Sequence, residues 1–217
     1  MQKKLIALAM AIGAIAAMAA PSVASAAPVL TQPTGTIVAA GTPVVGTNVG
    51  EMKMTTALGN VTCTAATVKG TVLSSSTASG TKGEATEASF VGSGVSSECT
   101  SWTGGVTVTT NVTGGLPWCF ETTSGDEGRV RGGKCSELSR GIKYILDFTS
   151  IGACEYNRST AVATTFATDV SGQDTTISMT EQEWTKVAGS AFCPSTGKLD
   201  ATFKLETTTG ASMYASS

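Results

Sequence analysis

The sequence predicts an all-β fold, specifically a disulfide-stapled antiparallel β-sandwich, with a barrel as the alternative. Apolar and polar residues alternate with period two in segments rich in Thr and Val, which is typical of strands. Glycines and Ser/Thr clusters interrupt these segments every 8–12 residues or so, roughly as in sandwiches and barrels. Helical periodicity is almost absent, whereas a parallel sheet would need helical crossovers.

The first half of the chain alternates in short segments. The predicted strands there are residues 36–39, 43–47, 52–57, 60–65, 68–73, 84–91 and 105–113. A hairpin is expected about Gly59, and residues 74–83 are predicted to be a polar surface loop. Val106 and Val108 would share the inward face of their strand, since successive side chains point to opposite faces.

The second half holds the most regular alternation. Its predicted strands are residues 142–148, 161–168, 175–180 and 200–206. Ile142, Tyr144, Leu146 and Phe148 follow period two strictly, so we expect this segment to be a central strand. Ala201, Phe203 and Leu205 are expected to point inward from the last strand.

Residues 116–135, LPWCFETTSGDEGRVRGGKC, predict a hairpin closed by two cysteines. Arg129 and Arg131 would project from one face of its second strand. Such a pair either offers an anion-binding surface or protects a sheet edge from aggregation, and we favour the edge. If the protein binds a partner through a loop, this is the candidate, with four ligand-binding residues: Asp126, Glu127, Arg129 and Arg131.

Residues 1–26 predict a cleaved signal peptide. Two lysines precede an apolar segment, and the A-x-A sequence at 24–26 places the cleavage site after Ala26. The alternative is an N-terminal membrane anchor, but the apolar run is short for a bilayer span, which needs ~20 residues. We therefore expect a secreted chain whose residues 27–217 form a single β-sandwich domain.

Charge is sparse after this segment. The 14 Lys and Arg residues fall to 12 without Lys3 and Lys4, against 16 Asp and Glu, and no block of like charges occurs. Electrostatic capture of nucleic acid or anionic lipid requires such a block. We expect neither nucleic acid nor, after signal cleavage, a membrane as a partner, which leaves an extracellular protein or a glycan.

The six cysteines all follow the predicted signal peptide, and an even number in an exported protein favours three disulfides. Many pairings are allowed and the sequence alone does not choose among them. We expect the sequential set, Cys63 with Cys99, Cys119 with Cys135 and Cys154 with Cys193. A metal site is the rival use, but the chain has no C-x-x-C pair and no histidine, so no metal and no cofactor are expected.

The absence of histidine also removes the base of Ser–His–Asp and Cys–His catalysis. Nucleotide-binding glycine loops are absent as well. Paired carboxylates could still serve a glycan-active hydrolase, but the acids between Glu84 and Glu155 cannot be paired from sequence. Asp147 stands out because it lies in a predicted strand beside inward aromatic residues. No catalytic residue is assigned.

Three tryptophans, Trp102, Trp118 and Trp184, allow two interpretations. They could form a stacking platform for sugar, or pack in the core, where two of them would lie near cysteines. A Trp packed against an inter-sheet disulfide is a familiar element of sandwich cores, so we favour the core.

The order GNVTC, ECTSW, LPWC, VRGGKC, CEY and FCPSTG resembles that of an uncharacterised family of exported, six-cysteine, β-rich proteins of high-GC Gram-positive bacteria. The resemblance covers most of the chain after residue 26. Its motifs are structural, namely cysteines, glycines and tryptophans, so it implies export and supports sequential disulfides but carries no activity and no site residue.

These observations predict a secreted extracellular or cell-surface module with a binding or structural role, and not an enzyme. The alternative is a carboxylate-dependent, glycan-active hydrolase. A third hypothesis is a secreted protease inhibitor that presents residues 121–134.

Overall fold

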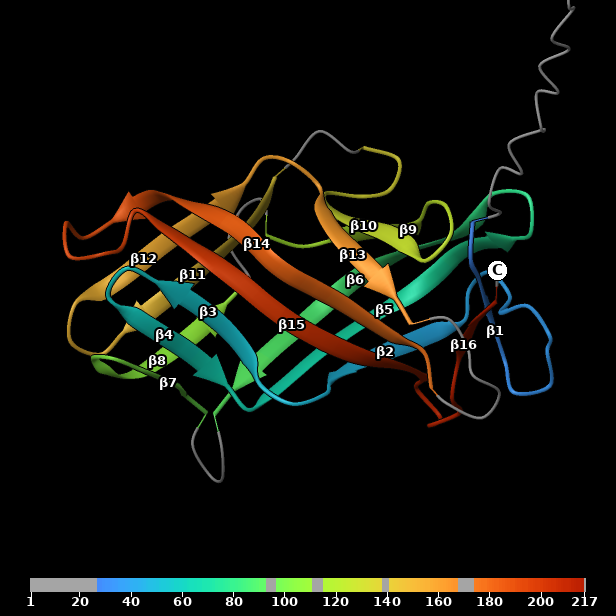
Figure 1. The fold of residues 1–217 in the computed structure, drawn as a ribbon, viewed down its shortest axis with the longest axis horizontal. Coiled ribbons are helices and arrows are strands. Elements are labelled where there is room, and N and C mark those ends of the chain that lie inside the picture. The colour runs from blue at the N-terminus through green and yellow to red at the C-terminus, as the bar shows by residue number, and fades with distance from the viewer. Residues whose placement is uncertain (1–26, 93–96, 111–114, 138–140, 168–173, 217) are drawn as a thin grey trace, which may run out of the picture.

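The structure, a computed structural model, describes residues 27–92, 97–110, 115–137, 141–167 and 174–216 (Figure 1). Within these ranges every regular element is a strand and every strand pairing is antiparallel, which confirms the predicted class. The strands are β1 (Val29–Thr31), β2 (Pro43–Asn48), β3 (Met52–Thr56), β4 (Gly59–Cys63), β5 (Ala65–Ser76), β6 (Gly80–Val91), β7 (Cys99–Ser101), β8 (Gly104–Thr109), β9 (Trp118–Thr122), β10 (Glu127–Gly132), β11 (Ile142–Phe148), β12 (Gly152–Arg158), β13 (Val162–Phe166), β14 (Thr176–Gly189), β15 (Thr196–Thr207) and β16 (Tyr214–Ser216). The predicted signal peptide, residues 1–26, lies outside the described residues.

Two long hairpins, β5–β6 and β14–β15, run along the length of the molecule, and β14–β15 passes in front of β5–β6 in Figure 1. Each strand of β14–β15 has different neighbours along its two halves. The half near the β14–β15 turn pairs with β12 and β3, and the other half pairs with β13 and β2. This hairpin therefore connects both ends of the large sheet.

The large sheet is an antiparallel sandwich and not a closed barrel. Its strands follow the order β10-β13-β14-β12-β11-β8-β7-β4-β3-β15-β2-β5-β6-β9. The last strand of this order, β9, also pairs with the first, β10. Two further pairings, β14–β15 and β6–β8, join strands that are not neighbours in this order. The remaining strands, β1 and β16, form a separate two-stranded sheet.

Two sequence predictions about the first half are wrong. Residues 36–39 form no strand: Ile37 makes only an isolated bridge to Thr31, and Val38 is fully buried in the core. Residues 74–83 are mostly strand, because β5 continues to Ser76 and β6 begins at Gly80 after a tight turn. Gly80 has φ +71°, which suits this turn. The hydroxyl groups of Ser75 and Thr81 pair at 2.8 Å across that hairpin and give its polar sequence a regular structure.

The predicted inward faces are confirmed in the strands that alternate most strictly. In β11, all four predicted residues are buried and the residues between them are not. Ala201, Phe203 and Leu205 of β15 are buried likewise. Inward residues such as these form a larger core cluster around β3, β4, β11, β12 and β14, and a smaller one that includes Leu30, Val72 and Met213.

The sequential disulfide pairing is confirmed, with bonds Cys63–Cys99, Cys119–Cys135 and Cys154–Cys193. The paired residues are 36, 16 and 39 positions apart. Loops of these lengths correspond to about 3–4 kcal/mol of stabilisation each in the chain-entropy model. Three disulfides fit an extracellular protein.

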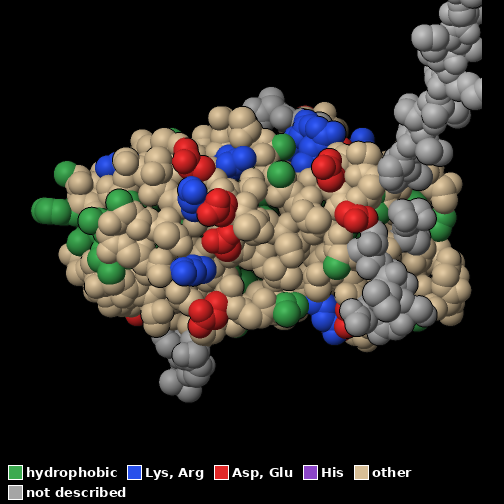
Figure 2. All heavy atoms as spheres, in the orientation of Figure 1, with side chains coloured by type: hydrophobic (Ala, Val, Ile, Leu, Met, Phe, Trp, Pro, Cys, Tyr) green, Lys and Arg blue, Asp and Glu red, His purple; other side chains and the backbone are tan. Residues whose placement is uncertain are grey.

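The described ranges contain no helix with the length and apolar character of a membrane span. On the face drawn in Figure 2, basic and acidic side chains are intermixed, as the sparse charge of the sequence leads one to expect. Apolar side chains gather at the end of the molecule where Figure 1 places the β14–β15 turn.

Candidate functional site

An apolar cavity of about 140 Å³ lies inside the sandwich. Strands β2–β6, β8–β11 and β13–β15 all contribute lining residues, so the cavity lies between the two long hairpins. Protein interiors are close-packed and contain few voids larger than a water molecule. An apolar cavity of ~150 Å³ in an engineered protein stays dry and binds benzene. This cavity therefore has room for a ligand of about that size.

Small residues opposite large ones create this space. Gly46 and Ala201 line the cavity together with Phe203 and Leu205. A Cβ atom added at Gly46 would lie 3.5 Å from Leu205 and 3.6 Å from Phe203, which is ordinary van der Waals contact. Space beside Gly46 is thus left open. Gly70, by contrast, is required by close strand approach, since its Cβ would lie 2.3 Å from the Glu84 carbonyl oxygen.

Three residues that line the cavity each carry a polar atom without a hydrogen-bond partner among the described residues. These atoms are the indole nitrogens of Trp118 and Trp184 and the hydroxyl oxygen of Thr110, and all three atoms are buried. Thr110 and Trp184 are only 2% and 3% exposed. Buried polar groups are nearly always paired, and an unpaired one costs about 1–3 kcal/mol. A ligand with a hydrogen-bond acceptor could satisfy these groups.

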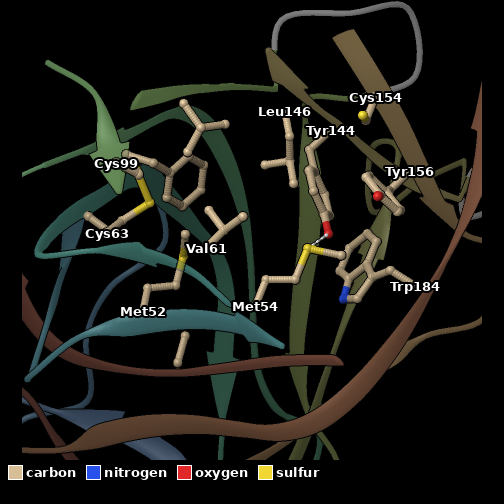
Figure 3. Packing of buried hydrophobic residues seen from close by; sticks show 14 of the residues in the cluster. Met52, Met54, Val61, Cys63, Cys99, Tyr144, Leu146, Cys154, Tyr156 and Trp184 are labelled. Atoms are coloured by element: carbon tan, nitrogen blue, oxygen red, sulfur yellow. Dashed lines mark hydrogen bonds between the residues drawn. A yellow bond between two sulfur atoms is a disulfide. The ribbon is translucent and has the colours of Figure 1, made fainter. Parts of the chain in front are cut away.

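Two aromatic residues of the lining, Tyr144 and Trp184, lie side by side, and Tyr156 packs on Tyr144 outside the lining (Figure 3). The ring centroids of Tyr144 and Trp184 are 4.8 Å apart in an edge-on arrangement, and those of Tyr144 and Tyr156 are 5.6 Å apart and stacked. The Tyr144 hydroxyl donates to Met54 Sδ at 2.7 Å. Figure 3 shows the Trp184 indole nitrogen turned away from that hydrogen bond, which agrees with its having no partner.

Burial keeps the Tyr144 phenol of the lining, and the Tyr156 phenol that packs on it, neutral. It raises the pKa of Tyr144 well above its ordinary value, with a further increase from the neighbouring Tyr156. Burial likewise raises the pKa of Tyr156 to about 12, while its hydroxyl donates to the Pro194 carbonyl at 3.0 Å. The lining, which includes Tyr144 and no described carboxylate, therefore stays uncharged near neutral pH and suits an uncharged ligand.

None of the described carboxylates lines the cavity. Asp147, which the sequence analysis singled out, is exposed, because the alternation that turns Leu146 and Phe148 inward turns it outward. Four other acids are paired with donors outside the cavity: Glu84, Glu87, Glu121 and Glu155. The described structure thus brings no carboxylate pair together at this site.

The hairpin of residues 116–135 forms as predicted, with β9 and β10 on either side of its turn. Asp126 and Glu127 are exposed at this turn. Cys119 and Cys135 close the hairpin. Nothing in the structure tests whether this loop binds a ligand.

The interpretation of Arg129 and Arg131 as a sheet edge is wrong, because β10 pairs with β9 on one side and β13 on the other. Both arginines instead contact Glu121, Arg129 Nε at 2.9 Å and an Arg131 terminal nitrogen at 3.4 Å. Lys82 approaches the same carboxylate at 3.7 Å. Glu121 is only 9% exposed, so these cations compensate a largely buried negative charge.

All three tryptophans pack in or against the core, which is the interpretation that the sequence favoured. Trp184 is buried in the larger core, while Trp102 and Trp118 are half-buried and pack against it. Trp102 lies beside Phe148, with ring centroids 5.1 Å apart. Two of the three, Trp118 and Trp184, prove to be cavity residues, a role that the sequence analysis did not anticipate.

Comparison of the chain with protein-family models, with curated proteins and with solved structures gives no match. The described residues contain no group of three or more His, Cys, Asp or Glu side chains that could hold a metal ion. The function is therefore argued from the cavity itself.

Proposed function

We propose that this protein is a secreted binding module that holds a small, uncharged, apolar molecule in its interior cavity. The observation that carries the proposal is the apolar space of about 140 Å³, three of whose lining residues carry a buried polar atom without a partner in the described part of the chain. A void left by poor packing would have no reason to gather unpaired indole and hydroxyl groups, each of which destabilises the fold.

Secretion is supported by three disulfides, by the predicted signal peptide and by the resemblance to exported six-cysteine proteins. A secreted binding module is also the function that the sequence predicts. The cavity adds the class of ligand.

The ligand class follows from the lining. Aliphatic and aromatic side chains favour an apolar body of about the size of a substituted benzene ring. The two indole groups can only donate, and the Thr110 hydroxyl can donate or accept. The ligand we propose therefore carries one acceptor oxygen, as in an ether, ketone or ester, and no charge.

Anisole and ethylbenzene test this proposal as a matched pair, because they differ only in an ether oxygen that replaces a methylene group. Each is titrated into ¹⁵N-labelled protein while the three indole N–H cross-peaks are followed by NMR. We expect both probes to shift the cross-peaks of Trp118 and Trp184 and to leave that of Trp102, which does not line the cavity, in place. Anisole should bind about fivefold more tightly, the factor expected for one neutral hydrogen bond.

A cavity-filling variant, Ala201→Leu, should abolish these shifts, because it occupies the space that the probe needs. Thr196→Leu adds the same side chain at the exposed start of the same strand and should leave binding unchanged. If neither probe moves the Trp118 and Trp184 cross-peaks at the solubility limit, the cavity is a closed void and the proposal fails.

A further inference from the structure

Four hairpin turns meet at one end of the molecule and form an apolar tip. They connect β3 with β4, β7 with β8, β11 with β12 and β14 with β15, at residues 57–58, 102–103, 149–151 and 190–195. Residues from all four turns line one shared hollow of about 490 Å³. Figure 1 places these turns at the same end, and Figure 2 shows apolar side chains gathered there.

The tip exposes large apolar side chains from different turns. Phe192 is 72% exposed and Leu58 is 53% exposed, and Trp102 and Ile151 contribute to the same hollow. Single exposed apolar residues are ordinary on a protein surface, but contiguous apolar patches mark interaction sites. The four turns together form such a patch.

The local structure holds Phe192 outward. The Cys193 N–H donates to the Ser190 carbonyl at 3.0 Å, which closes a turn with Phe192 at its corner. Cys193 is fixed to Cys154 of β12 by a disulfide. Lys186 Nζ donates to the carbonyls of Ser190 and Cys193 at 3.3 and 3.4 Å. The exposure of Phe192 is therefore built into a cross-linked turn.

Trp102, another residue that lines the hollow, is also fixed in place. It packs on Phe148, and a Cβ added at Gly59 would lie only 2.9 Å from the Trp102 Cβ. Gly59 also has φ +137°, so a glycine at this position permits both the turn and the close approach of the indole. The apolar residues of the tip thus come from rigid supports.

Charge is absent from the tip itself. None of the residues in the four turns is Asp, Glu, Lys or Arg. The nearest basic residue along the chain is Lys198, which pairs with Glu181, and the nearest acidic residue is Asp147. Lys186, four positions before the last turn, forms no ion pair with any described residue. Trp and Phe at the end of an uncharged surface, with a lysine set behind them, match the composition that proteins place at a membrane interface.

The small size of the tip decides between a lipid surface and a protein. A stable protein interface buries about 800 Å² on each partner and uses some 20–30 residues a side. The hollow is lined by nine residues on four short turns, far fewer than such an interface needs. A bilayer requires no matching surface, since each apolar side chain that enters the headgroup boundary contributes separately.

We propose that this tip docks the protein on the surface of a lipid bilayer. This proposal replaces the expectation of no membrane partner, which rested on charge alone. The sparse charge argues against electrostatic capture by anionic lipid, whereas the tip supplies apolar insertion. Docking does not depend on the cavity, because it uses turns whose residues are not cavity residues.

Co-sedimentation of the disulfide-bonded protein with vesicles of phosphatidylcholine, which carry no net charge, tests the proposal. We expect the wild-type protein to sediment with the vesicles. The double variant Leu58→Ser and Phe192→Ser should lower the partition coefficient by about tenfold or more, the factor expected when large apolar side chains no longer enter the lipid.

The matched control is Val49→Ser. Val49 is 51% exposed, almost as much as Leu58, but its backbone contacts Thr202 within β15 and it does not line the hollow. It should leave the partition coefficient unchanged. Failure of the wild-type protein to bind vesicles, or equal weakening by the control, overturns the proposal. A third outcome also overturns it: the wild-type protein does not bind vesicles, and sedimentation velocity shows that it forms a dimer which the double variant does not form. The tip would then contact a second copy of the chain.

Discussion

Replacing Ala201 by Leu places three further carbon atoms beside the interior cavity. Ala201 is 4% exposed and lines the cavity from the middle of β15. The effect on the free energy of unfolding depends on whether that space is open. Burial of the added groups contributes about 0.8 kcal/mol each, and the fixed leucine rotamer opposes this by roughly 0.5–1 kcal/mol. We therefore expect a net stabilisation of about 1.5 kcal/mol.

The opposite sign is expected if the interior around Ala201 is close-packed. Extra methylene groups in a filled core force strained rotamers and destabilise by about 1–3 kcal/mol. The sign of the change thus reports on the cavity directly and needs no ligand. It is a separate measurement from the NMR titration with anisole and ethylbenzene.

Urea unfolding of the non-reduced protein, followed by circular dichroism, gives this sign. The midpoint should rise for Ala201→Leu with no change in the slope m, which reports the surface exposed on unfolding. The exposed control Thr196→Leu should change the free energy by less than about 0.5 kcal/mol. Destabilisation by Ala201→Leu, at unchanged m and with a neutral control, would refute the reasoning, and the ligand proposal would lose its space.

Three further predictions concern charge. The folded protein should lose roughly 2–3 kcal/mol of stability as pH rises from 10 to about 12, because the Tyr156 phenol ionises in the unfolded chain but stays protonated in the folded one. Unfolding curves at alkaline pH measure this loss, and a flat profile contradicts it. A hydrogen bond from Lys204 lowers the pKa of Asp174. The Asp174 carboxylate therefore contributes stability above the ordinary carboxyl pKa, and this contribution is lost as pH falls through the lowered pKa. Lys204→Met should raise the pKa of Asp174 in a carboxyl ¹³C NMR titration, and an unchanged titration would count against the Lys204–Asp174 pair. Glu121→Gln keeps the side-chain shape but removes the negative charge that Lys82, Arg129 and Arg131 face. Because these partners are partly exposed, the variant should be destabilised by about 1–2 kcal/mol, and by more at low salt. Equal urea stability of the variant and the wild-type protein at low salt would contradict this prediction.

The period-two pattern explains which parts of the fold could be predicted. Alternation fixes which face of a strand is buried, so Tyr144 and Phe203 are inward as expected. The same rule turns Asp147 outward, so its position beside inward aromatic residues does not bury it. The alternation does not encode the order of strands in a sheet. The predicted edge position of Arg129 is therefore wrong, because β10 pairs with β13 on the side that was expected to be free.

The cavity could not be predicted, because it depends on which inward residues meet across the sandwich. Gly46, Ala85 and Ala201 are small and lie in three different strands, and nothing in the spacing of the sequence places them around one space. Inward small residues in otherwise bulky strands were the available signal. The unpaired indole groups of Trp118 and Trp184 are likewise a property of the assembled interior alone.

The disulfides are sequential, so no bridge encloses or crosses another along the chain. In a chain that emerges from a membrane N-terminus first, Cys63 meets Cys99 before any other cysteine is outside, and each later pair is completed in the same order. The correct partner is at every stage the first one within reach. Oxidation during emergence would therefore require little exchange of wrongly paired disulfides. A reduced, full-length chain refolded in vitro has all six cysteines available at once and lacks this order of pairing.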